Sequence, residues 1–377
     1  MYKMKIKTFP LRNPKPNFEE LQNVIKGNKK AERVHFVELF TDPEITTFII
    51  ENLLGEKAIP ETLIGNKPLS TPGMKEELIT QYVKVWYRMG YDYIPLVGAR
   101  VNDLYFPGKE QSTTDTALIN RGERVWLDEG IGMIHSWKDF EEYPWPDVDK
   151  IDYSIYEYSS DLLPEGMKII TNAGFGILEV CSEILFGFEG MSYLLYDNPE
   201  LVEAVFNKVG ELIYHFYENV AEINGIGAFF QGDDMGFKTS TLFSPQVLRK
   251  YVLPWHKKYA AVAHQHNKMY WLHSCGNIFS LMDDLIEDVR IDAFHSFQDE
   301  VFSVIEFYKK YGKRVTTLGG VDVDKLCTLD EIHLRSYVRE ILDECMPYRF
   351  ALGSGNSISN YTPVESYLIM LDEGLNW

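Results

Sequence analysis

A histidine and a cysteine two positions apart form the part of the sequence best suited to chemistry. They are His273 and Cys275, in the run 268–276 (KMYWLHSCG), where an apolar stretch meets a glycine. Residues i and i+2 of a strand point to the same face, so both side chains face the interior together or neither does. Imidazole and thiolate are ligands of Zn²⁺, whose catalytic sites hold three protein ligands and leave one position open. The pair therefore indicates zinc, and the alternative is a hydrogen-bonded core histidine beside a small buried cysteine.

The elements that must position this pair alternate between strand and helix. Eight short β-rich runs recur along the chain, each followed by a helical pattern. Near-continuous apolar strands that each return through a helix are typical of a parallel sheet covered on its outside, and eight of them close a barrel. We therefore predict the α/β class, as a (β/α)8 TIM barrel with an N-terminal extension. The eight runs are 33–40, 91–98, 167–175, 225–234, 268–276, 291–297, 313–322 and 349–355.

One connection of the predicted barrel is much longer than a normal loop. It extends from about residue 99 to 166 and contains the stretch 121–137 (RGERVWLDEGIGMIHSW), which we predict to be a β-hairpin laid over the barrel mouth. The chain has no internal repeat, low-complexity tract or linker. We therefore predict a single domain over residues 1–377, with 99–166 as a lid insertion.

Polar side chains gather where the predicted strands end. Because barrels of this kind carry their active sites at the carboxyl ends of the strands, these side chains are candidate site residues. Aromatic residues near the same ends would suit a flat aryl group. The predicted catalytic residues are Asn172, Asp233, Asp234 and Asp322; the predicted substrate-binding residues are Glu38, Tyr105, Phe175, Phe237, Gln298 and Ser354, with Phe106 and Trp126 as further aromatic candidates.

Several of these acidic residues also have a structural interpretation. Asp233 and Asp234 are adjacent on a strand and point to opposite faces, so one carboxylate can cap a turn while only its neighbour faces the site. Asp322 can cap the helix that starts near Lys325, and Glu38 can form a salt bridge at a strand end. The sequence leaves both interpretations open for each residue.

Composition limits the classes of partner. The chain has 377 residues, 45% of them hydrophobic, which is enough to bury one large core. Its 37 basic and 56 acidic residues give a formal charge of −19, which argues against nucleic acid and anionic membranes as partners. Four scattered cysteines do not form a disulfide framework, and neither a signal peptide nor an apolar run long enough to span a membrane is present. We expect a cytoplasmic protein.

Four sequence motifs resemble a known superfamily. They are LHSCGNI (272–278), GGVD (319–322), the long stretch 232–258 that begins GDDMGFKTSTLFSPQ, and the stretch 353–374 that begins GSGNSISNYTP. Together and in this order they resemble the uroporphyrinogen decarboxylase-like superfamily, over most of the chain from about residue 33 onward. The resemblance independently implies the barrel.

Two branches of that superfamily are relevant. Uroporphyrinogen decarboxylases carry an arginine-bearing loop after the first strand that grips a highly carboxylated tetrapyrrole, whereas this chain has VELFTDPEITTF (37–48), which is acidic and lacks arginine. In the corrinoid-dependent methyltransferases, a His-x-Cys pair on the fifth strand binds zinc with a further cysteine on the eighth. His273 and Cys275 match the pair, but Ser354 stands at the eighth-strand position. A third ligand must come from elsewhere; the first choice is Asp233 or Asp234, and the other candidates are Glu179, Asp322, Gln298 and His295.

The methyltransferase branch implies a specific reaction. The protein would move a methyl group from an O-methyl donor, such as an aryl methyl ether, to the Co(I) corrinoid of a partner protein, with zinc as Lewis acid. The implied cofactors are zinc and a corrinoid carried by the partner, and a homodimer is among the assemblies that the resemblance allows. One alternative is a decarboxylase-like lyase that uses a mouth aspartate without metal, and another is a non-enzymatic corrinoid- or ligand-binding protein.

Overall fold

A seven-stranded parallel sheet forms the centre of the molecule. The structure is a computed structural model that describes residues 6–59, 74–97, 104–117, 119, 122–127, 130 and 132–377. Neighbouring strands follow the order β1-β4-β5-β6-β7-β8-β9, so each strand lies beside the next one along the chain. Their bounds are β1 Tyr93–Leu96, β4 Lys168–Thr171, β5 Ile226–Gly232, β6 Met269–His273, β7 Ala293–His295, β8 Thr316–Leu318 and β9 Phe350–Ala351.

An extended segment around Phe36, the first of the predicted runs, lies between β9 and β1 and completes the ring of strands. Phe36 pairs in parallel with Leu352, beside β9, through two backbone hydrogen bonds of 2.8 Å. On the other side, the Tyr93 hydroxyl of β1 contacts the backbone N–H and carbonyl of Glu38 at 2.7 and 2.8 Å. Seven of the predicted runs therefore form the parallel sheet and the run 33–40 lies beside β9 as an extended segment, so the prediction of an α/β barrel is confirmed.

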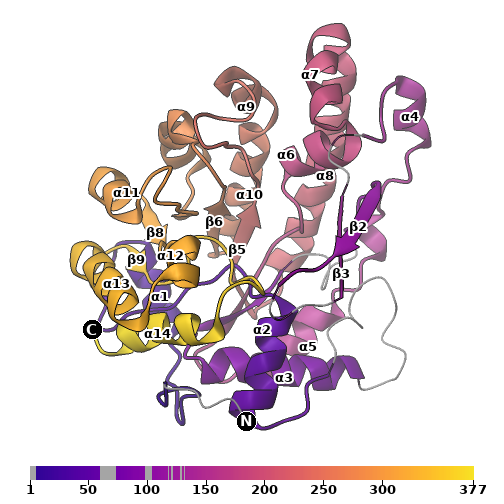
Figure 1. Cartoon of the computed structure of the whole chain (residues 1–377). Coiled ribbons are helices and arrows are strands. Elements are labelled where there is room, and N and C mark those ends of the chain that lie inside the picture. The colour runs from indigo at the N-terminus through magenta and orange to yellow at the C-terminus, as the bar shows by residue number, and fades with distance from the viewer. Residues whose placement is uncertain are drawn as a thin grey trace.

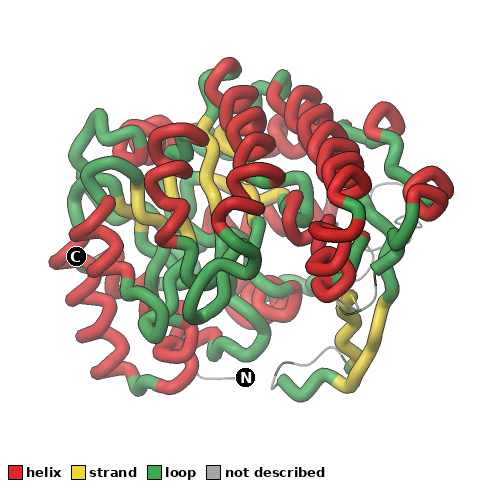
Figure 2. The backbone as a smooth tube through the Cα atoms, turned by 90° about the horizontal axis from the view of Figure 1, so that it is seen from above, coloured by secondary structure: helices red, strands yellow, loops and turns green. Residues whose placement is uncertain are grey.

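Helices surround the strands, as Figure 2 shows by its red coils around the central yellow segments, and Figure 1 labels most of them. The longest, α8, begins where the Asn198 side chain accepts the Leu201 N–H and Pro199 supplies the first helical residue. The helices are α1 Phe18–Ile25, α2 Pro43–Phe48, α3 Met74–Arg88, α4 Trp137–Glu142, α5 Ser154–Leu162, α6 Ile177–Glu179, α7 Phe188–Asp197, α8 Pro199–Ala221, α9 Pro245–Tyr251, α10 Leu253–Gln265, α11 Val304–Tyr311, α12 Val323–Thr328, α13 Glu331–Cys345 and α14 Val364–Leu375, with shorter turns at Ile49–Leu54, Val148–Lys150, Val180–Leu185, Phe279–Leu281 and Asp284–Val289.

Large apolar side chains pack between the strands in the interior of the barrel. Every residue of β6 is buried, and Trp271 at its centre packs edge-on against Tyr93 and Phe230 from other strands. Buried aromatic rings of this size hold strands at fixed positions, so the residues at the strand ends have a rigid base. Among the described residues, the structure contains no helix that is both long and apolar enough to cross a bilayer.

The insertion contains a β-hairpin, but its position differs from the one predicted. β2 (Glu110–Thr114) pairs antiparallel with β3 (Glu123–Leu127), so only one of the two strands falls in the stretch 121–137. The turn closes where the Asp115 N–H bonds the carbonyl of Gly122, which has φ +88°. Figure 2 shows the hairpin apart from the central strands, at the periphery of the molecule. That the insertion covers the mouth as a lid stays a prediction, as does the single-domain boundary.

Candidate metal centre

Three side chains of different chemistry converge after β5 and β6. Asp234, His273 and Cys275 each offer one ligand atom, and these atoms lie within 4.8 Å of one another. The His273 Nε2 is 3.4 Å from the Cys275 Sγ and 3.6 Å from the Asp234 Oδ1. Ligands about 2.0–2.3 Å from a tetrahedral Zn²⁺ are about 3.3–3.6 Å apart, so both distances fit such an ion. Three ligands leave the fourth position for a substrate atom.

The pairing of the two strands brings these ligands together. Gly232 of β5 is in register with His273 of β6, so Asp234 and Cys275 each follow two residues later on neighbouring strands. The Asp234 Oδ1 also accepts the Cys275 N–H at 2.8 Å, which fixes the carboxylate beside the sulfur. The spacing of histidine and cysteine therefore does place both on one face, as the strand period predicts.

Two glycines allow the loops behind these ligands to interlock. Gly276 has φ +77°, a left-handed conformation that other residues rarely adopt. A Cβ at Gly276 would lie 2.4 Å from the carbonyl carbon of Gly236, on the loop after β5. Next to this contact, the Asn277 N–H bonds the Phe237 carbonyl at 2.7 Å. The glycine that ends HSCG is thus needed because two backbones meet there.

The thiol of Cys275 depends on a cation to ionise. Burial, followed by the nearby Asp234 carboxylate, raises the pKa of the thiol to about 12. The Asn356 Nδ2 at 3.3 Å and the Ser296 hydroxyl at 3.8 Å donate toward the sulfur, which favours a thiolate but does not outweigh burial. A bound metal ion would supply the missing positive charge, because thiolate rather than thiol is the ligand. The donor set fits zinc.

The imidazole of His273 is held by a hydrogen bond at its Nδ1, on the side away from the other two ligands. Its Nδ1 is 2.7 Å from the Nδ1 of His295, whose Nε2 is 3.0 Å from the backbone carbonyl of Ser354. Burial, and then the neighbouring His273, lowers the pKa of His295 to about 3, and burial also lowers the pKa of His273. Burial therefore disfavours a positive charge on either ring, and the Nε2 of His273 faces the carboxylate and the sulfur.

Asp233 points away from the three ligands. Its carboxylate is fully buried and accepts the N–H groups of Leu178 and Glu179 at the start of α6. Its Oδ2 is 2.8 Å from the Nε2 of His256. Because adjacent strand residues face opposite sides, Asp233 anchors a helix while Asp234 lies with the ligands. These contacts give Asp233 a structural role.

Three other predicted site residues make structural contacts. The Asp322 carboxylate accepts the Lys325 N–H at 3.2 Å and the Asp299 N–H at 2.9 Å, and so caps α12. The Asn172 amide, after β4, donates to the Phe230 carbonyl at 3.2 Å. Gln298 forms a backbone turn with an exposed side chain. None of the three belongs to the ligand cluster found among the described residues.

Glu38 and Ser354 form a buried pair where the segment around Phe36 and the residues after β9 lie side by side. The Glu38 carboxyl bonds both the N–H and the hydroxyl of Ser354, and burial raises the pKa of Glu38 to about 8. The Ser354 hydroxyl also contacts the carbonyl of Asn356 at 3.0 Å. Ser354 therefore reaches the metal centre through its carbonyl, by way of His295, and its hydroxyl is engaged elsewhere.

Aromatic side chains near the strand ends differ in exposure. Tyr105, Phe175 and Phe237 are exposed by 38%, 45% and 63%, so all three can contact a ligand from solution. Phe106 is buried in the core, and the side chain of Trp126 lies outside the described residues. Phe237 is the one closest in sequence to Asp234, three positions away on the same loop.

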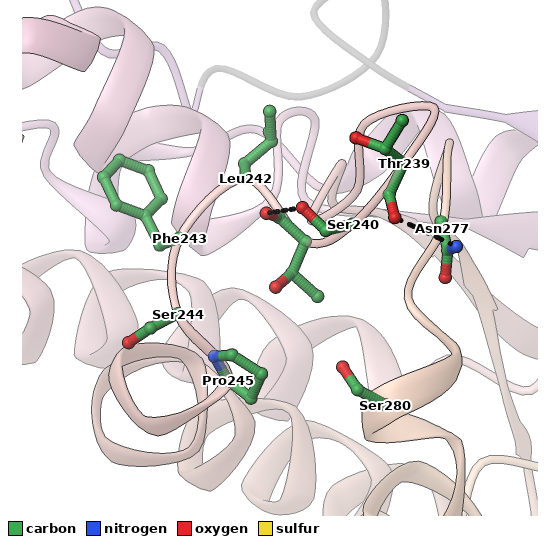
Figure 3. Close-up of a pocket in the computed structure, with 9 residues that line it drawn as sticks. Thr239, Ser240, Leu242, Phe243, Ser244, Pro245, Asn277 and Ser280 are labelled. Carbon is green, nitrogen blue, oxygen red and sulfur yellow. Dashed lines mark hydrogen bonds between the residues drawn. The ribbon is translucent and has the colours of Figure 1, made fainter.

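A polar pocket opens between the two loops that carry Asp234 and Cys275. Its volume is about 430 Å³, and Figure 3 shows hydroxyl and amide groups from both loops around it. The Ser240 hydroxyl and the Asn277 amide bond backbone carbonyls of Thr241 and Thr239. None of the described residues that line it carries a charge. The pocket suits a neutral group better than a carboxylate.

Sequence reasoning assigned no role to some residues that touch the ligands. Ser296 and Asn356 both contact the Cys275 sulfur, and Glu179 lies near Asp234. Burial and the carboxylates of Asp234 and Asp233 raise the pKa of Glu179 far above its usual value. The available signal was position, because Ser296 lies near the end of the predicted run 291–297 and Asn356 directly follows the run 349–355. Glu179 was named only as an alternative ligand.

Comparison with known proteins supplies the family. The family model described as uroporphyrinogen decarboxylase (URO-D) matches residues 136–374. A methyltransferase from Methanosarcina mazei has a similar structure, with a TM-score of 0.65, 14% sequence identity and coverage of 94% of this chain and 97% of that chain. A putative vitamin-B12 independent methionine synthase from Listeria monocytogenes gives a TM-score of 0.48 at 12% identity, covering 92% and 96% of the two chains. No curated protein matches in sequence. Because the family model extends over more than half of the length, the chain belongs to the uroporphyrinogen decarboxylase (URO-D) family.

Proposed function

We propose that this protein is a zinc-dependent methyltransferase that moves a methyl group from an O-methyl donor, in particular an aryl methyl ether, to the Co(I) corrinoid of a partner protein. The observation that carries the proposal is the cluster of Asp234, His273 and Cys275, whose spacing fits a tetrahedral ion. The similarity in fold to a methyltransferase adds support.

Each of the three residues has a defined part in the proposed reaction. His273, the last residue of β6, and Cys275, two residues later, would hold the metal, and Asp234 would complete the set with an oxygen ligand. A bound zinc ion would polarise the ether oxygen and stabilise the negative charge that develops on it as the methyl group leaves. His273 is buried and Cys275 only partly exposed, which limits the screening of that interaction by water on their side of the cluster.

The donor is proposed to be an uncharged aryl compound. The exposed rings of Phe175 and Phe237 offer flat apolar contact to an aryl donor. The polar pocket lined by residues such as Ser240 and Asn277 includes none of the three ligands, and it suits neutral hydroxyl substituents of the donor away from the reacting methyl group. A highly carboxylated tetrapyrrole would need cationic partners, which the described lining of this pocket does not include.

The corrinoid reaches the site on its own carrier protein in this proposal. The carrier must bring its cobalt close to the methyl carbon, and so must bind over the carboxyl ends of the strands. The formal charge of −19 favours a carrier whose contact surface is basic, through charge complementarity.

The alternative is a metal-free lyase in which Asp234 serves as proton donor. Metal content and activity separate the two functions. We expect about one zinc per chain and a change in cobalt absorption when an aryl methyl ether is added to the protein with Co(I) corrinoid carrier. Cys275→Ser should lose both, whereas Cys327→Ser, at a half-exposed cysteine far from the cluster, should lose neither. Full activity of the metal-free protein would support the lyase.

A further inference from the structure

We infer that His295 and the backbone carbonyl of Ser354 together fix the tautomer of His273, so that the Nε2 of His273 carries no proton and can bind a metal. His295 is thus a positioning residue, which acts through His273 and does not touch the ion. The inference deepens the proposed function and rests on the metal centre assigned there.

The geometry joins three groups in one line. The Ser354 carbonyl oxygen is 3.0 Å from the His295 Nε2, and the two Nδ1 atoms of His295 and His273 are 2.7 Å apart. At the far end, the His273 Nε2 faces the Asp234 carboxylate and the Cys275 sulfur at 3.6 and 3.4 Å. Both nitrogens of each ring are therefore accounted for.

If both rings are neutral, only one arrangement of their N–H protons satisfies the hydrogen bonds along this line. A carbonyl oxygen can only accept, so the proton of His295 must be on its Nε2. The Nδ1 of His295 is then an acceptor, and the proton between the two Nδ1 atoms belongs to His273. Since a neutral imidazole carries one N–H, the Nε2 of His273 is left with a free lone pair directed at the cluster.

The competing arrangement requires a charged ring in a closed space. If His295 were doubly protonated, it would donate to both neighbours, and His273 would carry its proton on Nε2, where it would block a metal. His295 is 1% exposed and packs edge-on against Phe230, so an imidazolium there would lose nearly all its hydration, and no carboxylate of the described residues pairs with it.

The surrounding residues hold the line in place. His273 and His295 are direct partners in the register of β6 and β7, so their rings lie side by side. Gly319 leaves the space for the bond to Ser354, because a Cβ there would lie 2.9 Å from the His295 Nε2 and 2.2 Å from the Ser354 oxygen. Ser354 is itself anchored through the Glu38 carboxyl. The line of hydrogen bonds from the Ser354 carbonyl through His295 to His273 is therefore fixed by the fold and does not depend on a metal.

The direct test reads the tautomer without any metal. In metal-free protein labelled with ¹⁵N-histidine, we expect His273 to show a protonated Nδ1 and a bare Nε2, and His295 to show the reverse. The surface residue His215, which is paired with Glu218, serves to identify an ordinary exposed signal. A protonated Nε2 on His273, or a doubly protonated His295, would overturn the inference whether or not the protein proves to be a methyltransferase.

Zinc affinity, measured by competition with a chelator, tests the consequence. His295→Leu removes the acceptor for the His273 Nδ1–H and should weaken zinc binding by about 10- to 100-fold, as loss of such outer partners does elsewhere. His295→Asn can present an amide oxygen at the Nδ1 position and should stay within a few-fold of wild type. His215→Asn should change nothing.

The two variants separate positioning from mere packing. If both bind zinc as tightly as wild type, or if His295→Asn is as weak as His295→Leu while its His273 keeps the bare Nε2, the inference is wrong. If His295→Leu does not fold, the tautomer measured in wild type still decides. Failure of the wild-type protein to bind zinc would instead count against the proposed function and would leave the tautomer result intact.

Discussion

Replacement of Glu38 by glutamine should remove a pH dependence from the stability of the fold. Glutamine has the same shape, its oxygen can accept the Ser354 N–H, and its amide can donate to the Ser354 hydroxyl, which can pass a hydrogen bond to the Asn356 carbonyl. The variant therefore keeps the contacts of a protonated Glu38 and loses only the ability to ionise. The nearby phenols of Tyr91 and Tyr367 stay neutral, because burial raises their pKa values well above the usual range.

The sign and size of the change in stability with pH follow from the raised pKa of Glu38. Burial moves the pKa of Glu38 from 4.5 to about 8, so the folded state holds this proton more tightly than the unfolded chain. The stability that comes from this group is complete below the unfolded pKa and is lost as the pH rises through the folded pKa. For these two values the loss between about pH 5.5 and about pH 8.5 is about 3 kcal/mol.

Urea denaturation of both proteins across this range measures the effect. The difference in unfolding free energy, Glu38→Gln minus wild type, should increase by about 3 kcal/mol from about pH 5.5 to about pH 8.5. Titrating groups common to both proteins cancel in the difference. Glu211→Gln, at an exposed position of α8, should give a flat difference. A flat or falling difference for Glu38→Gln would refute a neutral buried carboxyl at this position.

Three other substitutions test the metal centre and its support. Asp234→Asn should weaken zinc binding by about 10-fold or more in chelator competition and leave the melting temperature of the metal-free protein nearly unchanged, because Asp234 is partly exposed. Asp233→Asn should do the opposite: it should cost about 2–4 kcal/mol in unfolding free energy, because the buried carboxylate bonds His256 and the start of α6, while zinc content stays near one per chain. Gly276→Ala should lower both stability, by about 1–3 kcal/mol, and zinc affinity, since its Cβ would meet the Gly236 carbonyl.

The sequence predicts the barrel well because each strand of the barrel has a recognisable local pattern of residues. Each strand is a short apolar run bounded by polar or glycine residues, and each run is in the predicted place, including the one around Phe36. The hairpin was misplaced because β2 (Glu110–Thr114) is a polar strand without apolar alternation, so only its partner β3 resembled a strand. Strand periodicity detects burial, and the described side chains of β2, residues 111–114, are exposed.

The candidate site is less predictable, because it depends on contacts between strands. The period of two brings His273 and Cys275 to one face, and it also requires Asp233 and Asp234 to separate, but it does not say which of the two turns inward. Which aspartate turns inward depends on His256 of α10, which forms a buried hydrogen bond with the Asp233 carboxylate. The register of β6 and β7, which brings His295 against His273, likewise has no local signal.

The choice of third ligand matters for the chemistry proposed. A carboxylate and a thiolate carry the same charge, so a set of Asp234, His273 and Cys275 would neutralise Zn²⁺ as completely as a set with two thiolates. The oxygen ligand is harder and donates less electron density, which leaves the ion more able to draw charge from a bound ether oxygen. Ser354, in turn, supports the centre through a backbone carbonyl that any residue could supply, while its hydroxyl bonds Glu38. In the proposed centre, the residues after β9 would contribute to ligand orientation and the loop after β5 would contribute the ligand, an arrangement that would favour activation of an oxygen leaving group over activation of a thiol.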